Sequence, residues 1–267
     1  MAFPTAETEA VRSAFAKNSG GPYFPTDTTP PVFGTVAAER DAVQRAAHCG
    51  GCLAIAFLAI AAPRGATISN AADDSIRQFL AQDDTQPAYR AERRLEAETG
   101  GRRGWIQAVT TYSPQTGFVY EVTGEGGSGF IRNKVLRAVL DGERDVLAKG
   151  EAARSSLAPP NYTFQANGAD ENGLVNVLLT PRRKERVLVA GSMTLRARDG
   201  DLVCLKGRLA KSPSFWVKNV DIVRHYERIG GAILPVALES DAQLRPFGTA
   251  VLRMTYRYLE VDGRPVL

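Results

Sequence analysis

The chain has 267 residues, of which 33 are Lys or Arg and 29 are Asp or Glu, so its formal net charge is +4. This mild excess, with both signs interspersed, does not favour a nucleic-acid-binding protein. Two histidines and three cysteines are too few for a zinc site built from these residue types, and we expect neither a metal nor another cofactor.

Residues 1–44 have the composition of a disordered segment. They contain Gly20-Gly21 and three prolines between residues 25 and 31, and they show no sustained apolar period. Chains that cannot bury apolar surface stay disordered. We therefore interpret residues 1–44 as a disordered extension or a mis-called start, with the true start near Val36 or Val43.

Residues 45–71 have the pattern of a secretory signal peptide. Arg45 precedes an unbroken apolar run at 53–62, and small residues follow it. Spanning a bilayer takes about 20 apolar residues, so an anchor is disfavoured. Cleavage is expected after Ala71, with Ala61 as second choice, and a buried core helix is the alternative. The CGGC pair at 49–52 lies inside this signal without a βαβ context, so a redox role is disfavoured.

The mature chain, residues 72–267, begins with a short amphipathic helix at 75–82, preceded by Asp73 and Asp74. Period-two segments at 88–98, 103–112 and 118–125 with short turns predict an antiparallel meander. In the first of these strands, one face carries Tyr89, Ala91, Arg93, Leu95 and Ala97, and the other carries Arg90, Glu92, Arg94, Glu96 and Glu98. We expect the charged face to be solvated.

A long helix is predicted at 129–150, capped by Ser128 and open to interruption at Gly142. The helical stripe that we expect to cover the sheet consists of Ile131, Val135, Leu136, Val139, Leu140, Val146 and Leu147. Its polar side is expected to carry Arg132, Lys134, Arg137, Asp141, Glu143 and Arg144. We interpret the glycine-rich stretch 124–129 before the helix as a flexible hinge in preference to an anion site, because it lacks the lysine of a P-loop.

Strands resume after residue 160, at 161–168, 173–182, 186–197, 201–209, 214–229, 232–240 and 248–261. In the last of them Leu252, Met254, Tyr256 and Tyr258 alternate with polar residues. The predicted fold class is α+β: a large curved antiparallel sheet, a half-open β-barrel, wrapped around one long and one short helix.

The sequence does not favour an enzyme. A Ser-His-Asp site in the mature chain would need His225 as its base, and His225 lies in a strand pattern where an ordinary half-exposed histidine is expected. The acidic pairs Asp199/Asp201 and Glu239/Asp241 are interpreted as turn acids. Cys204 would be the one mature cysteine, and a buried apolar thiol is its expected state.

Residues 160–264 resemble the C-terminal half of outer-membrane lipoprotein-sorting proteins of the LolA/LolB type and their relatives, including the periplasmic sensor RseB. The likeness is carried by LTPRRK at 179–184, DGDL at 199–202, the strand 220–226 followed by IGG at 229–231, LP at 234–235 and VDG at 261–263. It implies a half-open barrel with helices at its mouth, an apolar cavity for acyl chains, and the periplasm of a Gram-negative bacterium.

The resemblance also implies an arginine on an early strand that latches the lid, and Arg90, Arg93 and Arg94 are all candidates. No cysteine follows the apolar run closely, as a LolB-type lipobox would require. We therefore expect a soluble monomer that is peripheral to the membrane at most.

The resulting prediction is a periplasmic carrier for acyl chains of lipid or lipoprotein, involved in outer-membrane lipoprotein sorting. Shielding an acyl chain from water is worth about 0.8 kcal/mol per methylene. The expected cavity lining consists of Trp105, Phe118, Met193, Phe215, Trp216, Met254 and Tyr256, under a lid helix with Ile131, Val135, Leu136, Val139 and Leu140. The alternative is a periplasmic sensor or envelope-assembly module that binds other envelope proteins through the open sheet edge or the basic cluster 182–186.

Overall fold

One antiparallel sheet of eleven strands dominates the part of the chain that the computed structural model describes, which is residues 65–82, 85–213, 215, 217–245 and 248–266. The strands are β1 (Tyr89–Thr99), β2 (Arg102–Ser113), β3 (Gly117–Gly127), β4 (Tyr162–Ala169), β5 (Leu174–Pro181), β6 (Val189–Arg196), β7 (Leu202–Leu209), β8 (Val217–Ile229), β9 (Ala232–Leu244), β10 (Thr249–Val261) and β11 (Arg264–Pro265). All described residues belong to one compact unit.

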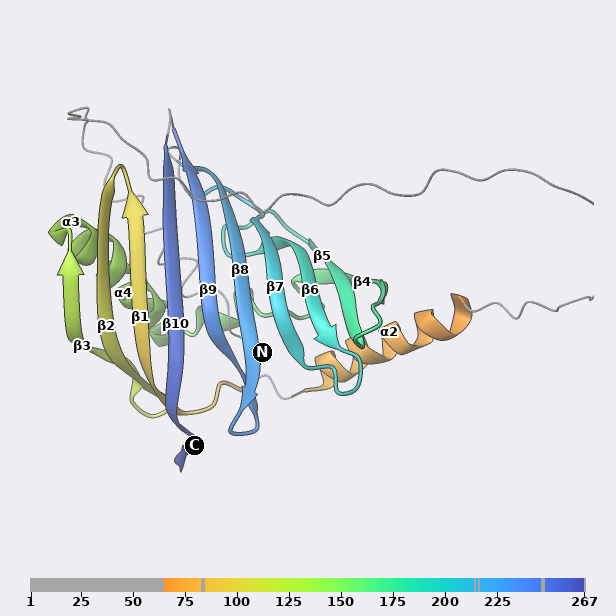
Figure 1. Cartoon of the computed structure of the whole chain (residues 1–267). Helices are drawn as coiled ribbons and strands as arrows, with labels where there is room; N and C mark the ends of the chain where they lie inside the picture. The colour runs from red at the N-terminus through yellow and green to blue at the C-terminus, as the bar shows by residue number, and fades with distance from the viewer. Residues whose placement is uncertain (1–64, 83–84, 214, 216, 246–247, 267) are drawn as a thin grey trace, which may run out of the picture. The chain divides into compact units, whose positions relative to one another are not determined.

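The strand order is β3-β2-β1-β10-β9-β8-β7-β6-β5-β4, with β11 paired to β10 (Figure 1). The early meander is thus joined to the later strands where β1 pairs with β10, and the two ends of the order, β3 and β4, do not meet. The sheet is therefore open, and the predicted α+β class with a large curved antiparallel sheet is confirmed.

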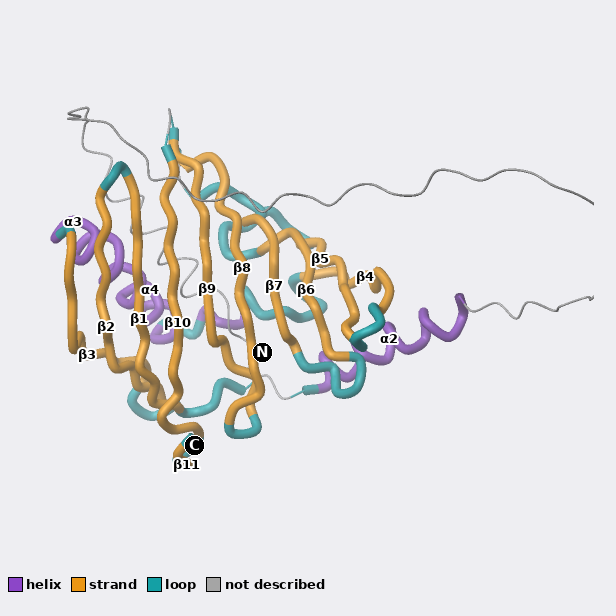
Figure 2. The backbone as a smooth tube through the Cα atoms, viewed as in Figure 1, coloured by secondary structure: helices purple, strands orange, loops and turns teal. Residues whose placement is uncertain are grey.

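Two helical segments accompany the sheet (Figure 2). Helix α2 spans Gly65–Ala81, and a longer segment runs from α3 (Gly129–Ile131) through a π-helical turn, η1 (Arg132–Leu136), into α4 (Arg137–Ala148). A 3-10 turn, η2 (Glu151–Arg154), follows. We call residues 129–148 the lid helix. The interruption that the sequence left open at Gly142 does not occur, and Ser128, predicted to cap the helix, holds the N-cap position without a side-chain capping bond.

Strand β9 is longer than predicted. It ends at Leu244 and not at Ser240, because inward and outward residues go on alternating: Ala242 is buried and Asp241 is exposed. Glu239 and Asp241 are consequently strand residues and not turn acids, and Glu239 pairs with Arg253 of β10 at 2.7 Å. Acidic residues near the end of a strand pattern suggest a turn, but at alternate positions they also fit the solvated face of a longer strand.

Apolar side chains form two cores on the sheet. The larger core joins the lid helix to β1, β2, β3, β8, β9 and β10, and the smaller joins α2 to β4–β7, with Tyr226 and Ile233. In β1 the buried residues are Tyr89, Ala91, Arg93, Leu95 and Ala97, as the period predicted. We call the sheet face that carries them the inner face.

Helix α2 begins ten residues before the predicted start, at Gly65 in place of Ser75. Ala71, the predicted cleavage site, therefore lies within α2. Residues 1–44 and the apolar run of the predicted signal lie outside the described residues, so the signal peptide and its cleavage stay predictions.

Gly200 allows α2 to dock on the turn between β6 and β7. Its φ is +68°, and an added Cβ would lie 2.7 Å from the Phe79 backbone nitrogen and 2.8 Å from the Gln78 Cβ. The turn is also held by Asp201, which is buried and accepts hydrogen bonds from Arg228 Nε at 2.9 Å and Arg196 Nη1 at 3.2 Å.

We expect Gly200→Ala to destabilise the protein more than Gly117→Ala does. Both glycines have positive φ, +68° and +70°, but nothing lies within 4 Å of a Cβ at Gly117. Gly117→Ala should cost only the left-handed backbone penalty of roughly 1–2 kcal/mol, whereas Gly200→Ala adds a clash with α2. Urea unfolding of the two variants measures the difference, and equal losses would contradict this docking.

Candidate functional site

The lid helix covers the inner face of β1, β2 and β3 with the residues predicted for it. Ile131, Leu136, Val139 and Leu140 are fully buried and Val135 is 2% exposed. They belong to one cluster with Leu95 of β1 and Ile106 of β2. The π-helical turn at Arg132–Leu136 lies in the middle of this contact, and such turns inside α-helices occur frequently at functional sites.

A buried ion pair fastens the lid helix to the sheet. Arg93 of β1 is 2% exposed. Its Nη1 donates to Glu143 Oε2 at 2.5 Å and its Nη2 to Glu143 Oε1 at 3.0 Å. Nη2 also donates to the Tyr89 hydroxyl at 2.6 Å. Because Glu143 belongs to α4, this bidentate pair joins the helix to β1, the third strand from the β3 end of the sheet.

Three aromatic rings surround the Arg93 guanidinium. Its carbon lies 4.7 Å from the ring centre of Tyr256, 5.2 Å from that of Phe118 and 5.8 Å from that of Tyr89. Burial by itself would lower the Arg93 pKa, but the Glu143 carboxylate, helped by Tyr89 and Tyr256, outweighs burial and raises this pKa well above its ordinary value. The guanidinium is thus charged, and its plane is held in place.

Of the three arginines that the resemblance left open, Arg93 alone contacts the lid helix among the contacts the structure shows. Arg90 and Arg94 point to the opposite, outer face, where Arg94 pairs with Glu96 at 2.7 Å. The alternation of faces along β1 explains this difference, because it places Arg93 on the inner face together with Leu95 and Ala91.

Glu143 was assigned to the polar side of the helix, and this prediction is wrong. Its side chain is buried, with 6% exposure for the residue. The signal that would have found it is spacing: Glu143 follows Leu136 by seven residues and Val139 by four, which places it on the apolar stripe. A charged side chain on that stripe needs a buried partner of opposite charge, and Arg93 is that partner.

The predicted lining residues do not form one set. Phe118, Met254 and Tyr256 are buried in the core around Arg93. Met193 lies in the smaller core, on β6. Phe215 is 73% exposed, with its ring 5.5 Å from the Arg245 guanidinium carbon. Trp216 lies outside the described residues.

Trp105 lies on the outer face of β2, because the inner positions of that strand are Gly104, Ile106 and Ala108. The Arg94 guanidinium carbon lies 4.4 Å from its ring centre. A Cβ at Gly126 would come within 2.7 Å of the Trp105 Nε1. The glycine-rich stretch, predicted as a flexible hinge, is therefore the end of β3, where small residues let the strand pack against Trp105 and β2.

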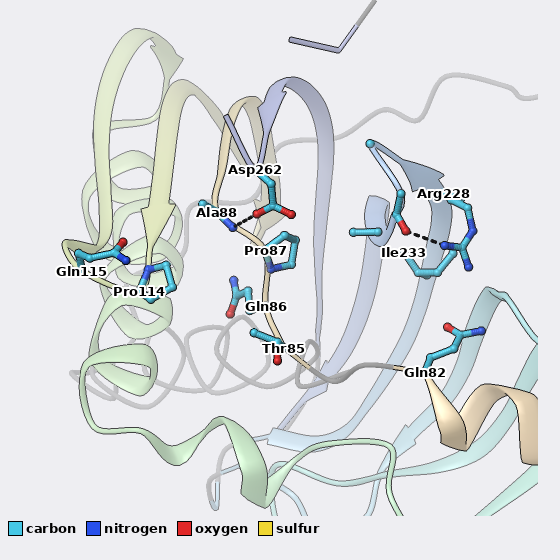
Figure 3. A pocket seen from close by; sticks show the side chains of 13 residues that line it. Gln82, Thr85, Gln86, Pro87, Ala88, Pro114, Gln115, Arg228, Ile233 and Asp262 are labelled. Atoms are coloured by element: carbon cyan, nitrogen blue, oxygen red, sulfur yellow. Dashed lines mark hydrogen bonds between the residues drawn. The ribbon is translucent and has the colours of Figure 1, made fainter. Parts of the chain in front are cut away.

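A pocket of about 700 Å³ opens among the turns at one end of the sheet (Figure 3). Its walls come from the segment before β1, the β2–β3 turn, the β8–β9 turn and the β10–β11 turn; they consist of Gln82, Thr85, Gln86, Pro87, Ala88, Pro114, Gln115, Arg228, Gly230, Gly231, Ala232, Ile233 and Asp262. Asp262 accepts a hydrogen bond from the Ala88 nitrogen at 2.9 Å. The size suits a ligand, but the walls are mixed in polarity and include none of the predicted lining residues.

Cys204, predicted to be buried, is only partly buried, and it lies on β7 opposite His225 of β8. Burial raises the pKa of the Cys204 thiol, and Lys206 only partly offsets this. Since the thiolate is the reactive form, we expect alkylation by iodoacetamide to reach half its maximal rate at a pH above about 8.5, the usual cysteine value. A midpoint below that value would contradict the burial, and the urea-unfolded protein provides the control.

Among the described residues, no group of three or more His, Cys, Asp or Glu is placed to hold a metal ion. None of the described helices has the length and apolar character needed to cross a membrane.

Comparison with known proteins finds similarity to solved structures only. No family model matches the sequence, and no curated protein matches it. A DUF1329 family protein from Desulfovibrio piger is 10% identical, with a TM-score of 0.32 over 72% of this chain and 92% of that chain. A LolA superfamily protein from Nitrosomonas europaea is also 10% identical, with a TM-score of 0.30 over 71% of this chain and 94% of that chain. The Nitrosomonas europaea protein belongs to the superfamily that the sequence pattern resembles. At these sequence identities and TM-scores, neither similarity supports a statement about function.

Proposed function

We propose that the chain is a periplasmic carrier that holds acyl chains of lipid or lipoprotein on the inner face of its sheet, after the lid helix has moved aside. One observation carries this proposal: on an open sheet the lid helix covers a region of apolar side chains around Arg93, and a buried ion pair holds the helix there. Involvement in lipoprotein sorting, a cleaved signal peptide and a monomeric state belong to the same proposal.

The free energies of lid and ligand are of similar size. Burying a large apolar side chain is worth about 1.5–3 kcal/mol, so the five lid residues together contribute on the order of 10 kcal/mol. An acyl chain with about fourteen methylenes gains on the order of 11 kcal/mol on burial. An acyl chain can therefore offset the apolar contacts that the lid helix makes with the sheet, which a reversible carrier requires.

Arg93 and Glu143 set the threshold for this exchange. Separating a buried ion pair leaves charge in an apolar surrounding, and removing one partner of such a pair costs about 3–5 kcal/mol. The lid therefore stays closed until a ligand compensates for the pair as well as for the apolar contacts.

The test is to express the full-length chain in a Gram-negative bacterium, purify it from the periplasm without detergent, and analyse bound molecules by native mass spectrometry. We expect one or two lipid or lipoprotein acyl species bound per chain and released on unfolding. A chain that leaves the periplasm with no acyl species, and that takes up none from vesicles, would contradict the proposal.

The open edges of the sheet support a second candidate, a sensor or assembly module that binds an envelope protein. Among the described strands, β3 and β4 each have one unpaired edge, to which an extended segment could add. The basic cluster 182–186 supports it less, because Arg182 donates to the Pro159 carbonyl at 2.7 Å and Arg183 to Asn161 Oδ1 at 2.8 Å. Retention of an envelope protein by the lipid-free chain would favour this candidate.

A further inference from the structure

We infer that the ligand is an anionic amphiphile, whose acyl chain takes the place of the lid helix and whose carboxylate or phosphate takes the place of the Glu143 carboxylate on Arg93. This inference rests on the proposed function and adds the chemical class of the ligand. It assigns to Arg93 a role in selecting that ligand, besides its role in closing the lid.

The Arg93 charge lies on the part of the sheet that the lid helix covers. Arg93 lies on the inner face of β1 between Leu95 and Ala91, which are both fully buried. Any acyl chain that lies where the lid helix now lies must pass this guanidinium. A molecule that is apolar along its whole length would place methylene groups against a charge.

Opening of the lid releases the hydrogen-bond donors of Arg93 from Glu143. Glu143 accepts two hydrogen bonds from Arg93, from Nη1 and Nη2, and it leaves the sheet together with α4. Two donors in a fork then face the space that the helix has vacated. A carboxylate or phosphate accepts such a fork in the same bidentate manner, whereas an ester or an alcohol brings no charge to it.

The two donors of Arg93 keep their geometry when the lid helix leaves. The rings of Tyr256, Phe118 and Tyr89 belong to the sheet and not to the lid helix, and they lie within 5.8 Å of the guanidinium carbon. Arg93 is therefore held in position before the ligand arrives, so that little side-chain entropy is lost on binding. The surrounding apolar side chains strengthen the electrostatic preference for an oxyanion.

The experiment compares ligands that share one acyl chain. Full-length protein, freed of bound lipid, is titrated calorimetrically with palmitate, with 1-palmitoyl lysophosphatidic acid and with uncharged 1-palmitoylglycerol, each below its micelle concentration. We expect at least one of the two anions to bind about tenfold more tightly than the uncharged ligand or better. Which anion binds more tightly tells a carboxylate ligand from a phosphate ligand.

Two variants and one control separate selection from folding. Arg93→Met should bring the ratio of anion to neutral affinity close to one, and Arg94→Gln, which removes an arginine from the outer face of the same strand, should leave it unchanged. Glu143→Gln should raise the affinity for the anions more than that for the neutral ligand, because the competing carboxylate is gone. This second variant decides the matter if Arg93→Met does not fold.

The outcomes are distinct. Equal affinities of the wild-type protein for anionic and uncharged ligands, or an unchanged ratio in Glu143→Gln, would overturn the inference and leave the carrier proposal standing. Binding of none of the three ligands would overturn both.

Discussion

Replacing Glu143 by leucine should lower the free energy of unfolding by about 3–5 kcal/mol, among the largest effects of any single substitution in this chain. The substitution leaves the Arg93 guanidinium, 2% exposed, without the carboxylate that binds it through two hydrogen bonds, and breaking a buried pair from one side costs that much. The double variant Arg93→Met/Glu143→Leu should recover most of the loss, since apolar side chains then meet in the same space. Urea unfolding of both single variants and the double variant measures the coupling.

The matched control is the exposed pair of Arg257 and Glu92 on the outer face of β10 and β1, whose side chains are 70% and 30% exposed. Arg257→Gln should cost less than about 1 kcal/mol, because solvent screens an exposed pair. Losses of the same size at Glu143 and Arg257 would show that the lid pair is not buried as described.

Leu140→Ala should cost about 2–5 kcal/mol and should also increase the binding of an apolar dye such as anilinonaphthalene sulfonate. Leu140 is fully buried between the lid helix and the inner face of the sheet. Its truncation weakens the contact that holds the lid closed, so the open form, with its apolar face accessible, becomes more populated. Fluorescence titration with the dye, below the onset of unfolding, is the measurement.

Leu195→Ala is the matched control for this prediction. Leu195 is also fully buried, but it lies on β6 in the smaller core, away from the lid helix. The substitution should cost a similar free energy without raising dye binding. If both variants bind more dye to the same extent, the effect reflects general loosening and not opening of the lid.

The strands were predictable because each of them is solvated on one face, and this imposes a period of two that the sequence shows directly. In β1 that period placed Arg93 on the inner face beside Leu95, and the structure agrees. The helical stripe from Ile131 to Leu140 was predictable for the equivalent reason, a period near 3.6.

The partner of Arg93 was not predictable with the same rule. Glu143 was assigned to solvent because it is charged, although its spacing from Leu136 fits the stripe. Most charged helix residues face solvent whatever their spacing. This rule fails when a buried residue of opposite charge lies across the contact between helix and sheet.

Contacts between distant segments account for the remaining differences. Trp105 was predicted to line a cavity because it is large and lies on a strand, but the register of β2, with Ile106 facing inward, places it outside. The pocket at the end of the sheet is built from the segment before β1 and three turns that are far apart in sequence, such as those containing Gln115 and Asp262. No local pattern marks such a site, because its walls exist only once the sheet has formed.

The most direct test of the carrier account is a distance measurement across the lid. Spin labels are placed at Asp145 on the exposed side of α4 and at Thr255 on the outer face of β10, in a chain whose native cysteines are replaced by serine. Labels at Lys206 and Thr255, both on the sheet, serve as the control pair. On adding lysophosphatidic acid, the distance from Asp145 to Thr255 should increase while the control distance stays constant. A ligand that binds with both distances unchanged would contradict the claim that acyl chains replace the lid helix on the sheet.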